Sequence, residues 1–169
     1  MRWNTWENGV VLAVAVGVFA LAGQVLGQGT DPLIGTWKLN VAKSTYSPGP
    51  VPKSSTLKYE AAGSGIKVSV DGVAADGSTG KWGFTANYDG KDVPITGNNP
   101  YAADMATMKR VNPTTTETTY KKGGKVTTTN VRVISADGKT LTITTTGTDT
   151  QGRAVKNVAV YEKQSSGTD

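Results

Sequence analysis

The chain has 169 residues, with 18 lysine and arginine residues against 13 aspartate and glutamate residues and a formal net charge of +5. It contains no histidine and no cysteine, which excludes Ser-His and Cys-His nucleophile systems and zinc bound by histidine or thiolate. The length allows one domain with a hydrophobic core of its own. The 21 glycines, together with a threonine-rich second half, favour strands and tight turns over helices.

The first 27 residues have the features of an export signal. Arg2 and the amino terminus precede an uninterrupted apolar stretch, 10–22, and small or apolar residues follow at 25–27. The apolar stretch is shorter than the roughly 20 residues that a membrane-spanning helix needs. We therefore predict a signal peptide over 1–27, a secreted or periplasmic mature protein and no stable membrane anchor after cleavage; a retained anchor is the alternative. Position 28 is Gln28, not cysteine, so lipidation there is excluded.

After a lead-in segment at 28–34, short segments that favour strands alternate with turn signals up to residue 163. Glycine-containing dipeptides that accept a positive φ occur at 71–72, 76–77, 89–90, 123–124, 137–138 and 151–152. Ten strands are predicted between and around them, at 35–40, 55–61, 65–70, 81–88, 92–96, 103–111, 114–121, 125–134, 139–146 and 153–163. No window has an apolar stripe of helical period. Residues 164–169 are predicted to be a disordered tail.

The alternation of side chains indicates how the strands close. Apolar residues share one face in several segments, for example Ile66, Val68 and Val70. The strands between 114 and 150 carry threonine on both faces, so they cannot form a wholly dry core. A barrel resolves this, because it encloses a partly polar interior and removes exposed edges. We predict an all-β fold, a single antiparallel up-and-down meander barrel of about 8–10 strands over residues 35–163.

Two short motifs carry a resemblance to a known family. The sequences GTWKL at 35–39 and VAVYEK at 158–163 make the chain similar to the lipocalin and fatty-acid-binding-protein (calycin) superfamily, as a secreted lipocalin-like domain. The resemblance implies that Trp37 plugs one end of the barrel, that Gly35 lets the chain turn beneath it, and that Tyr161 points into the cavity. Ala159 replaces the arginine that fatty-acid-binding proteins use for a ligand carboxylate.

The segment between the first two strands also departs from that family. Fatty-acid-binding proteins have two helices here, whereas Pro48, Pro50 and Pro52 exclude a regular helix from 42–55. We interpret this segment as a rigid connector, with a portal over one barrel mouth as the alternative.

Aromatic and arginine side chains are the candidate ligand contacts, and they are Tyr59, Trp82, Phe84, Tyr88, Arg110, Tyr120, Arg132 and Tyr161. Alternation places Arg132 on the same face of its strand as Asn130 and on the opposite face from Val131. It leaves open which of the two faces points inward. The surface is the default position for both arginines. An internal arginine would need a partner, for which Glu60, Glu117 or a ligand anion are the candidates.

Function follows from what these residues can do. Without histidine or cysteine we expect no enzyme, no cofactor and no metal site. We interpret 89–92 as a turn and not a calcium site, and the basic run 121–125 as a hairpin turn and not a polyanion contact. The first hypothesis is a monomeric carrier that holds a small apolar or amphipathic molecule and binds no nucleic acid. The alternative is an extracellular or envelope structural module whose barrel is filled by side chains, with no pocket above roughly 300 Å³.

Overall fold

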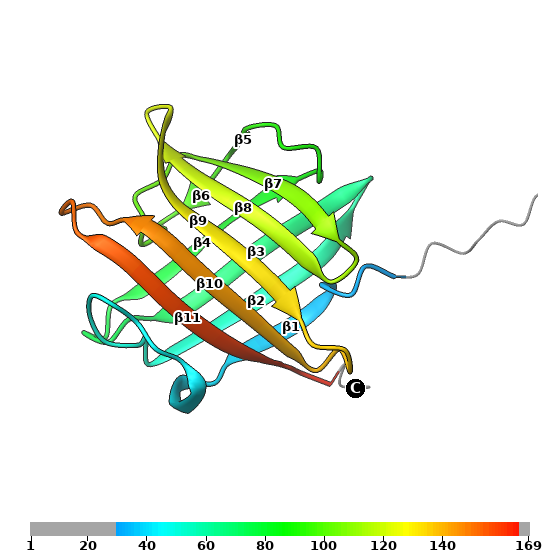
Figure 1. Ribbon diagram of the computed structural model, residues 1–169, viewed down its shortest axis with the longest axis horizontal. Coiled ribbons are helices and arrows are strands. Elements are labelled where there is room, and N and C mark those ends of the chain that lie inside the picture. Colours follow the sequence, from blue (N-terminus) through cyan, green and yellow to red (C-terminus); the bar gives the residue numbers. More distant parts are fainter. Residues whose placement is uncertain (1–29, 166–169) are drawn as a thin grey trace, which may run out of the picture.

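Strands follow one another along the chain with little else between them. The computed structural model describes residues 30–165, so the predicted signal peptide and residues 166–169 lie outside the described residues (Figure 1). The elements are β1 (Gly35–Leu39), the 3-10 helix η1 (Val41–Lys43), β2 (Ser54–Ala62), β3 (Gly65–Val73), β4 (Thr79–Ala86), β5 (Val93–Pro94), β6 (Thr96–Gly97), β7 (Met105–Asn112), β8 (Thr115–Lys122), β9 (Lys125–Ile134), β10 (Thr140–Thr148) and β11 (Ala154–Lys163).

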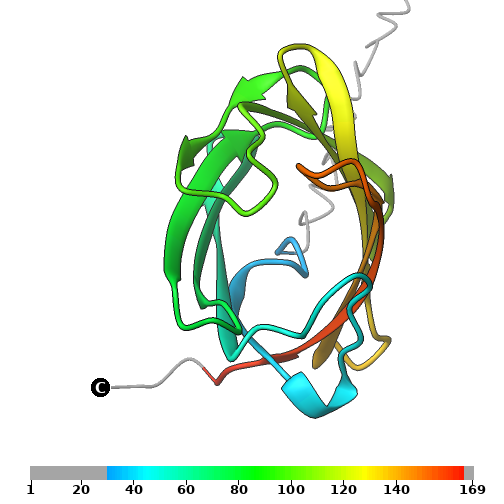
Figure 2. The same ribbon diagram turned by 90° about the vertical axis from the view of Figure 1, so that its left-hand side faces the viewer.

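All strands belong to one antiparallel sheet that rolls into a nearly closed barrel (Figures 1 and 2). The order is β5-β7-β8-β9-β10-β11-β1-β2-β3-β4-β6, so β1 joins the last strand to the second. The segment 93–97 bridges the remaining gap, because Val93 pairs with Ala106 of β7 and Gly97 pairs with Trp82 of β4. The predicted fold class, an all-β antiparallel meander barrel, is confirmed.

Two details of the prediction need correction. The sheet has 11 strands and not 8–10, because the predicted strand 92–96 divides into β5 and β6 around Ile95. The dipeptide Asp71-Gly72, predicted as a turn, lies within β3, and the turn between β3 and β4 uses Asp76-Gly77 instead. Asp76 stabilises that turn by accepting hydrogen bonds from the backbone N–H (2.9 Å) and hydroxyl (2.7 Å) of Ser78.

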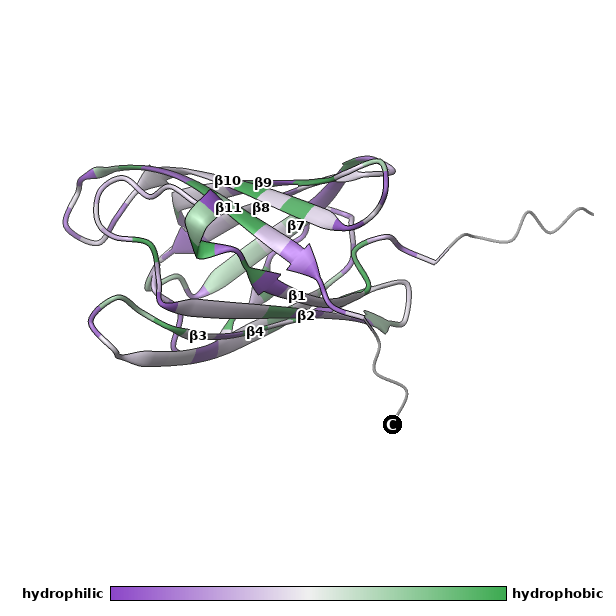
Figure 3. Ribbon diagram, turned by 90° about the horizontal axis from the view of Figure 1, so that it is seen from below, coloured by the Kyte–Doolittle hydropathy of each residue, from purple (hydrophilic) through white to green (hydrophobic). Residues whose placement is uncertain are grey.

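Alternate side chains of each strand face the barrel interior, and hydropathy changes along the strands accordingly (Figure 3). The fully buried apolar residues come from both halves of the chain and include Trp37, Ile66, Met108 and Leu141. On β8 and β9 the inward positions carry polar groups as well, and Thr116, Thr118 and Thr128 are all buried. The partly polar interior predicted from the threonine-rich segments is therefore present.

One end of the barrel is closed by the chain that leads into β1. The Trp37 side chain is 0% exposed, and its indole N–H donates a hydrogen bond to the carbonyl of Leu33 (2.8 Å), which is itself buried. Gly35 has a φ of 132°, and a Cβ there would lie 2.9 Å from the Lys163 side chain. The positive φ favours glycine at this position, whereas the Lys163 contact involves the far end of a flexible side chain that can shift. The structure thus buries Trp37 beneath the lead-in segment, at the end of the barrel where the resemblance implies a plug of Gly35 and Trp37.

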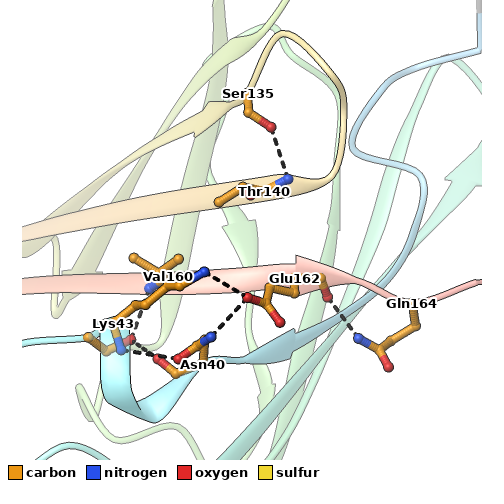
Figure 4. A network of polar contacts seen from close by, with 8 residues as sticks. Asn40, Lys43, Ser135, Thr140, Val160, Glu162 and Gln164 are labelled. Atoms are coloured by element: carbon orange, nitrogen blue, oxygen red, sulfur yellow. Dashed lines mark hydrogen bonds and ion pairs between the residues drawn. The ribbon is translucent and has the colours of Figure 1, made fainter.

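The segment after β1 is anchored along the outside of β11. Asn40 and Lys43 both contact the Glu162 carboxylate, at 2.8 and 3.1 Å (Figure 4). Thr45 then pairs with Val158 in an antiparallel bridge. These contacts continue the sheet edge beyond the short β1 and fix where the proline segment leaves it.

Candidate functional site

The barrel encloses a cavity of about 410 Å³. Its lining includes the segments 46–52, 72–80 and 98–101 and the turn between β10 and β11. These segments lie at the open end of the barrel, opposite the lead-in segment, and this open end faces the viewer in Figure 2. Cavities of this size hold small molecules, since ligand pockets range from about 300 to 1,000 Å³. The interior is therefore large enough for a ligand and is not filled by side chains.

The cavity has one apolar and one polar wall. The apolar wall consists of Leu57 on β2, Val68 and Val70 on β3, and Trp82 on β4. The polar wall comes from the strands of the second half of the chain, where Ile143, Val155 and Ala159 also line the cavity; its polar members are Asn130, Arg132, Thr145 and Asn157. A molecule in this cavity would contact hydrocarbon on one side and hydrogen-bonding groups on the other.

Arg132 is the charged group of the polar wall, and its residue is only 3% exposed. The guanidinium donates hydrogen bonds to three side-chain oxygens, at 3.0 Å to Tyr59, 2.5 Å to Thr118 and 3.1 Å to Tyr120. No ion pair among residues 30–165 involves Arg132. The surface default for this arginine is wrong, because Arg132 and the residues that share its face of β9, such as Asn130, point inward.

The neighbours of Arg132 offer hydrogen bonds and no negative charge. Burial raises the pKa of Tyr120 to about 12, although Arg132 opposes the shift, so its phenol is neutral at pH 7. Within the described residues, Asp149 is the single acidic residue of the cavity lining, and it pairs with Arg153 at 2.7 Å in an exposed turn. The three hydrogen bonds offset part of the desolvation penalty of this buried guanidinium, but no counter-ion among residues 30–165 neutralises its charge. The polar wall therefore carries a positive charge at Arg132.

Aromatic rings form the part of the cavity between the two walls. Trp82 meets Tyr120 edge to face, with ring centroids 5.9 Å apart. Tyr101 stacks on Tyr120 at 5.3 Å and meets Trp82 edge to face at 6.4 Å. Tyr101 comes from the loop between β6 and β7, where Asn99 accepts the backbone N–H groups of Tyr101 and Ala103, both at 3.1 Å. This cluster forms an aromatic surface of the cavity beside Arg132.

The proline segment reaches the same cavity from its open end. Tyr46, Pro48, Pro50 and Pro52 belong to the lining. The segment is tied to the polar wall, because the Asn157 side-chain carbonyl accepts a hydrogen bond from the Ser47 backbone N–H at 3.0 Å. The structure places the segment where either a connector or a portal would lie.

The structure brings together five of the eight predicted ligand contacts. Tyr59, Trp82, Tyr120, Arg132 and Tyr161 line the cavity.

The other three predicted contacts, Phe84, Tyr88 and Arg110, lie outside the lining. Phe84 is covered by the rings of Trp82 and Tyr120, with centroids 6.5 and 6.3 Å away.

Tyr88 and Arg110 belong to the closed end of the barrel. Both donate a hydrogen bond to the same carboxylate oxygen of Asp31, in the lead-in segment. The Arg110 guanidinium also lies over the Tyr88 ring, 4.0 Å from its centroid. Arg110 therefore pairs with Asp31, and the two acidic partners considered from sequence, Glu60 and Glu117, were wrong. These groups hold the lead-in segment on the plug.

Sequence reasoning missed part of the cavity. Asn157 and Thr145 belong to strands that were predicted correctly, but their facing depends on the register with β9. Tyr101 lies in a loop, where no periodicity reports the direction of a side chain. The available signal was that Arg132 and Asn130 share one face of their strand. Which face points inward could be decided only if one residue on it was known to be buried.

Other kinds of site find little support in the described residues. Between residues 30 and 165, no group of three or more acidic side chains is placed to hold a metal ion. No helix of that range is long and apolar enough to cross a membrane. In the basic run 121–125, Gly123 and Gly124 have positive φ and form the turn between β8 and β9, as predicted. The run 89–92 is no regular turn, because Asp89 forms an antiparallel bridge with Lys109, although its carboxylate accepts the Lys91 backbone N–H at 3.1 Å.

Neither a protein-family model nor a curated protein sequence matches this chain. A solved structure with a similar arrangement is that of the zebrafish ileal bile acid-binding protein complexed with cholic acid. It is 13% identical in sequence, with a TM-score of 0.47, and the match covers 79% of this chain and 99% of that one.

Proposed function

We propose that this protein is a non-enzymatic carrier whose barrel binds one small amphipathic molecule with an anionic group. The observation that carries the proposal is Arg132, a buried guanidinium that lines a cavity of about 410 Å³ and has no acidic partner among residues 30–165. The ligand's anionic group would take the place of that partner. Its apolar part would pack on the wall of β2–β4 and on Trp82.

The alternative, a structural module with a filled barrel, is less well supported. That hypothesis predicts no pocket above roughly 300 Å³, and the cavity exceeds this volume. The polar atoms within it would also be hard to explain in a barrel that needs only a packed core, because buried polar groups without partners are destabilising.

Calorimetric titration of the full chain with three ten-carbon probes tests the proposal. Decanoate, decanol and decyltrimethylammonium share an alkyl chain and differ in the charge of the head group. We expect decanoate to bind at one molecule per chain, decanol to bind more weakly, and the cation not to bind. Failure of all three probes, or equal binding of all three, would contradict the proposal.

Two arginine variants locate the charge. Arg132→Met should weaken decanoate binding by about tenfold to a hundredfold, because a charge-assisted hydrogen bond contributes about 1.5–3 kcal/mol. Arg110→Met is the matched control, since this second arginine pairs with Asp31 outside the cavity. If both variants bind decanoate as the unmodified protein does, the anion site is not at Arg132.

We also propose that the carrier is exported, lipocalin-like and monomeric, acting outside the cytoplasm without a retained anchor or a nucleic-acid partner. The support is the apolar stretch 10–22 and its flanking residues, as in secretory signals. Amino-terminal sequencing of the protein from its own host tests this, with a mature chain that begins near Gln28 as the expected result. A chain that keeps residues 1–27 would contradict export by cleavage.

A further inference from the structure

The polar wall contains a row of side chains that Arg132 alone does not explain. The inward residues Thr118, Asn130, Thr145 and Asn157 occupy one line across β8, β9, β10 and β11. They are cross-strand partners in turn: Asn130 pairs with Thr118 and Thr145, and Thr145 with Asn157. All four residues are buried, between 0% and 7% exposed. We name this row the polar belt.

The belt begins next to the guanidinium. Thr118 accepts the hydrogen bond from Arg132, and its cross-strand partner Asn130 follows. Directly opposed side chains in an antiparallel pair have Cβ atoms about 4.5–5.5 Å apart. A ligand group on Asn130 is therefore only a few bonds away from a group that binds Arg132.

One atom of the belt has no partner. The side-chain oxygen of Asn130 is buried and accepts no hydrogen bond among the described residues, although Asn130 lines the cavity. Buried polar groups are nearly always hydrogen-bonded, and an unsatisfied acceptor costs about 1–3 kcal/mol. A carboxylate cannot fill this position, because it has no proton to donate. The Asn130 oxygen is free to accept a hydrogen bond from a donor group, and the Tyr101 hydroxyl lies beside the Asn130 and Thr145 side chains.

We infer that the ligand carries a hydroxyl group, or a donor like it, close to its anionic group. The hydroxyl would donate to Asn130 and lie beside Thr145, whose own hydroxyl lies on the neighbouring strand in the same row. This inference rests on the proposed function, since it assumes an anion at Arg132. It narrows the ligand class from anionic amphiphiles to hydroxylated ones, with the hydroxyl near the head.

Three probes of equal chain length test the inference by calorimetry on the full chain. These probes are decanoate, its beta-hydroxy analogue and its omega-hydroxy analogue. We expect the beta-hydroxy acid to bind about three- to tenfold more tightly than decanoate, the gain of one net hydrogen bond. The omega-hydroxy acid should show no gain, because its hydroxyl is at the far end of the chain from Arg132.

Two belt variants and one control decide where the preference arises. Thr145→Val preserves the side-chain shape, and Asn130→Leu removes the unsatisfied oxygen. In each variant, the ratio of the affinity for the beta-hydroxy acid to the affinity for decanoate should fall towards one, while decanoate still binds. Thr144→Val is the control, because Thr144 lies next to Thr145 on β10 but outside the set of inward positions. The preference of this variant for the beta-hydroxy acid should be unchanged.

The outcomes separate the two proposals. Equal binding of decanoate and the beta-hydroxy acid overturns the inference and leaves the carrier function intact. A preference that persists in both belt variants overturns it as well. Absence of binding by all three acids overturns the carrier function, and the role of the belt with it. Should Asn130→Leu fail to fold, Thr145→Val still decides the result.

Discussion

The two ends of this barrel use similar residue types for opposite purposes. Each contains an arginine and a tyrosine in contact, but at the closed end Arg110 and Tyr88 share the carboxylate of Asp31, whereas around Arg132 the partners are neutral hydroxyl groups. The first arrangement is satisfied by the protein itself. The second lacks a negative charge that a ligand can supply. An arginine therefore indicates binding here only where the fold leaves its charge unpaired.

The largest effect is expected at the closed end. Trp37→Ala should lower the free energy of unfolding by about 3–5 kcal/mol, because it removes a fully buried aromatic ring and the hydrogen bond to Leu33. Denaturant unfolding of the two proteins measures the difference. Val111→Ala, at a position that is 62% exposed, is the control and should change stability by no more than about 0.5 kcal/mol. A loss that small for Trp37→Ala would mean that Trp37 is no plug.

The turns of the meander were largely predictable because their signals lie in adjacent residues. The roles of Gly35 and Trp37 were not worked out from the residues but were implied by the resemblance that the short motif 35–39 carries. The ion pair of Asp31 with Arg110 was not predictable, since 79 residues separate the partners and only the closure of the barrel brings them together.

The cavity was predicted less completely, since its composition depends on register. Asn130 and Arg132 share one face of β9. If that face points inward, both residues line the polar wall of the cavity, and if it points outward, both lie on the surface. Alternation gives two equal answers until one neighbour is known to be buried. The aromatic members Tyr59, Trp82 and Tyr161 were easier, because large apolar side chains seldom face solvent in a strand.

The anchoring of the lead-in segment gives the next largest effect. Asp31→Ala should destabilise the protein by about 1–3 kcal/mol, because it leaves Arg110 and Tyr88, both partly buried, without their shared acceptor. Asp71→Ala removes an exposed pair with Lys81 and should change stability by less than about 1 kcal/mol. Equal losses in the two variants, measured by urea unfolding, would show that the Asp31 cluster is no stronger than a surface ion pair.

Alkaline pH should test the burial of the tyrosines at the open end. Burial raises the pKa of Tyr161 above its ordinary value of 10.0, so the folded protein keeps a proton that the unfolded chain releases. The stabilisation is complete below about pH 10 and declines as the pH rises further, by about 1.4 kcal/mol per pH unit for this group. Tyr161→Phe should therefore make the decline of stability above pH 10 shallower by that amount. An unchanged slope would place the Tyr161 hydroxyl in contact with solvent.

The smallest change in stability is expected from Arg132, the residue to which the proposed function assigns the ligand's anionic group. Arg132→Met loses three hydrogen bonds, but it also removes the desolvation penalty of a buried charge without a counter-ion. The two effects oppose each other, so the free energy of unfolding should change by less than about 1 kcal/mol while decanoate binding weakens by about tenfold to a hundredfold. A loss of 3 kcal/mol or more would instead make Arg132 a structural residue like Arg110, satisfied by its tyrosines. The contrast between the two ends would then disappear, because both arginines would serve the fold.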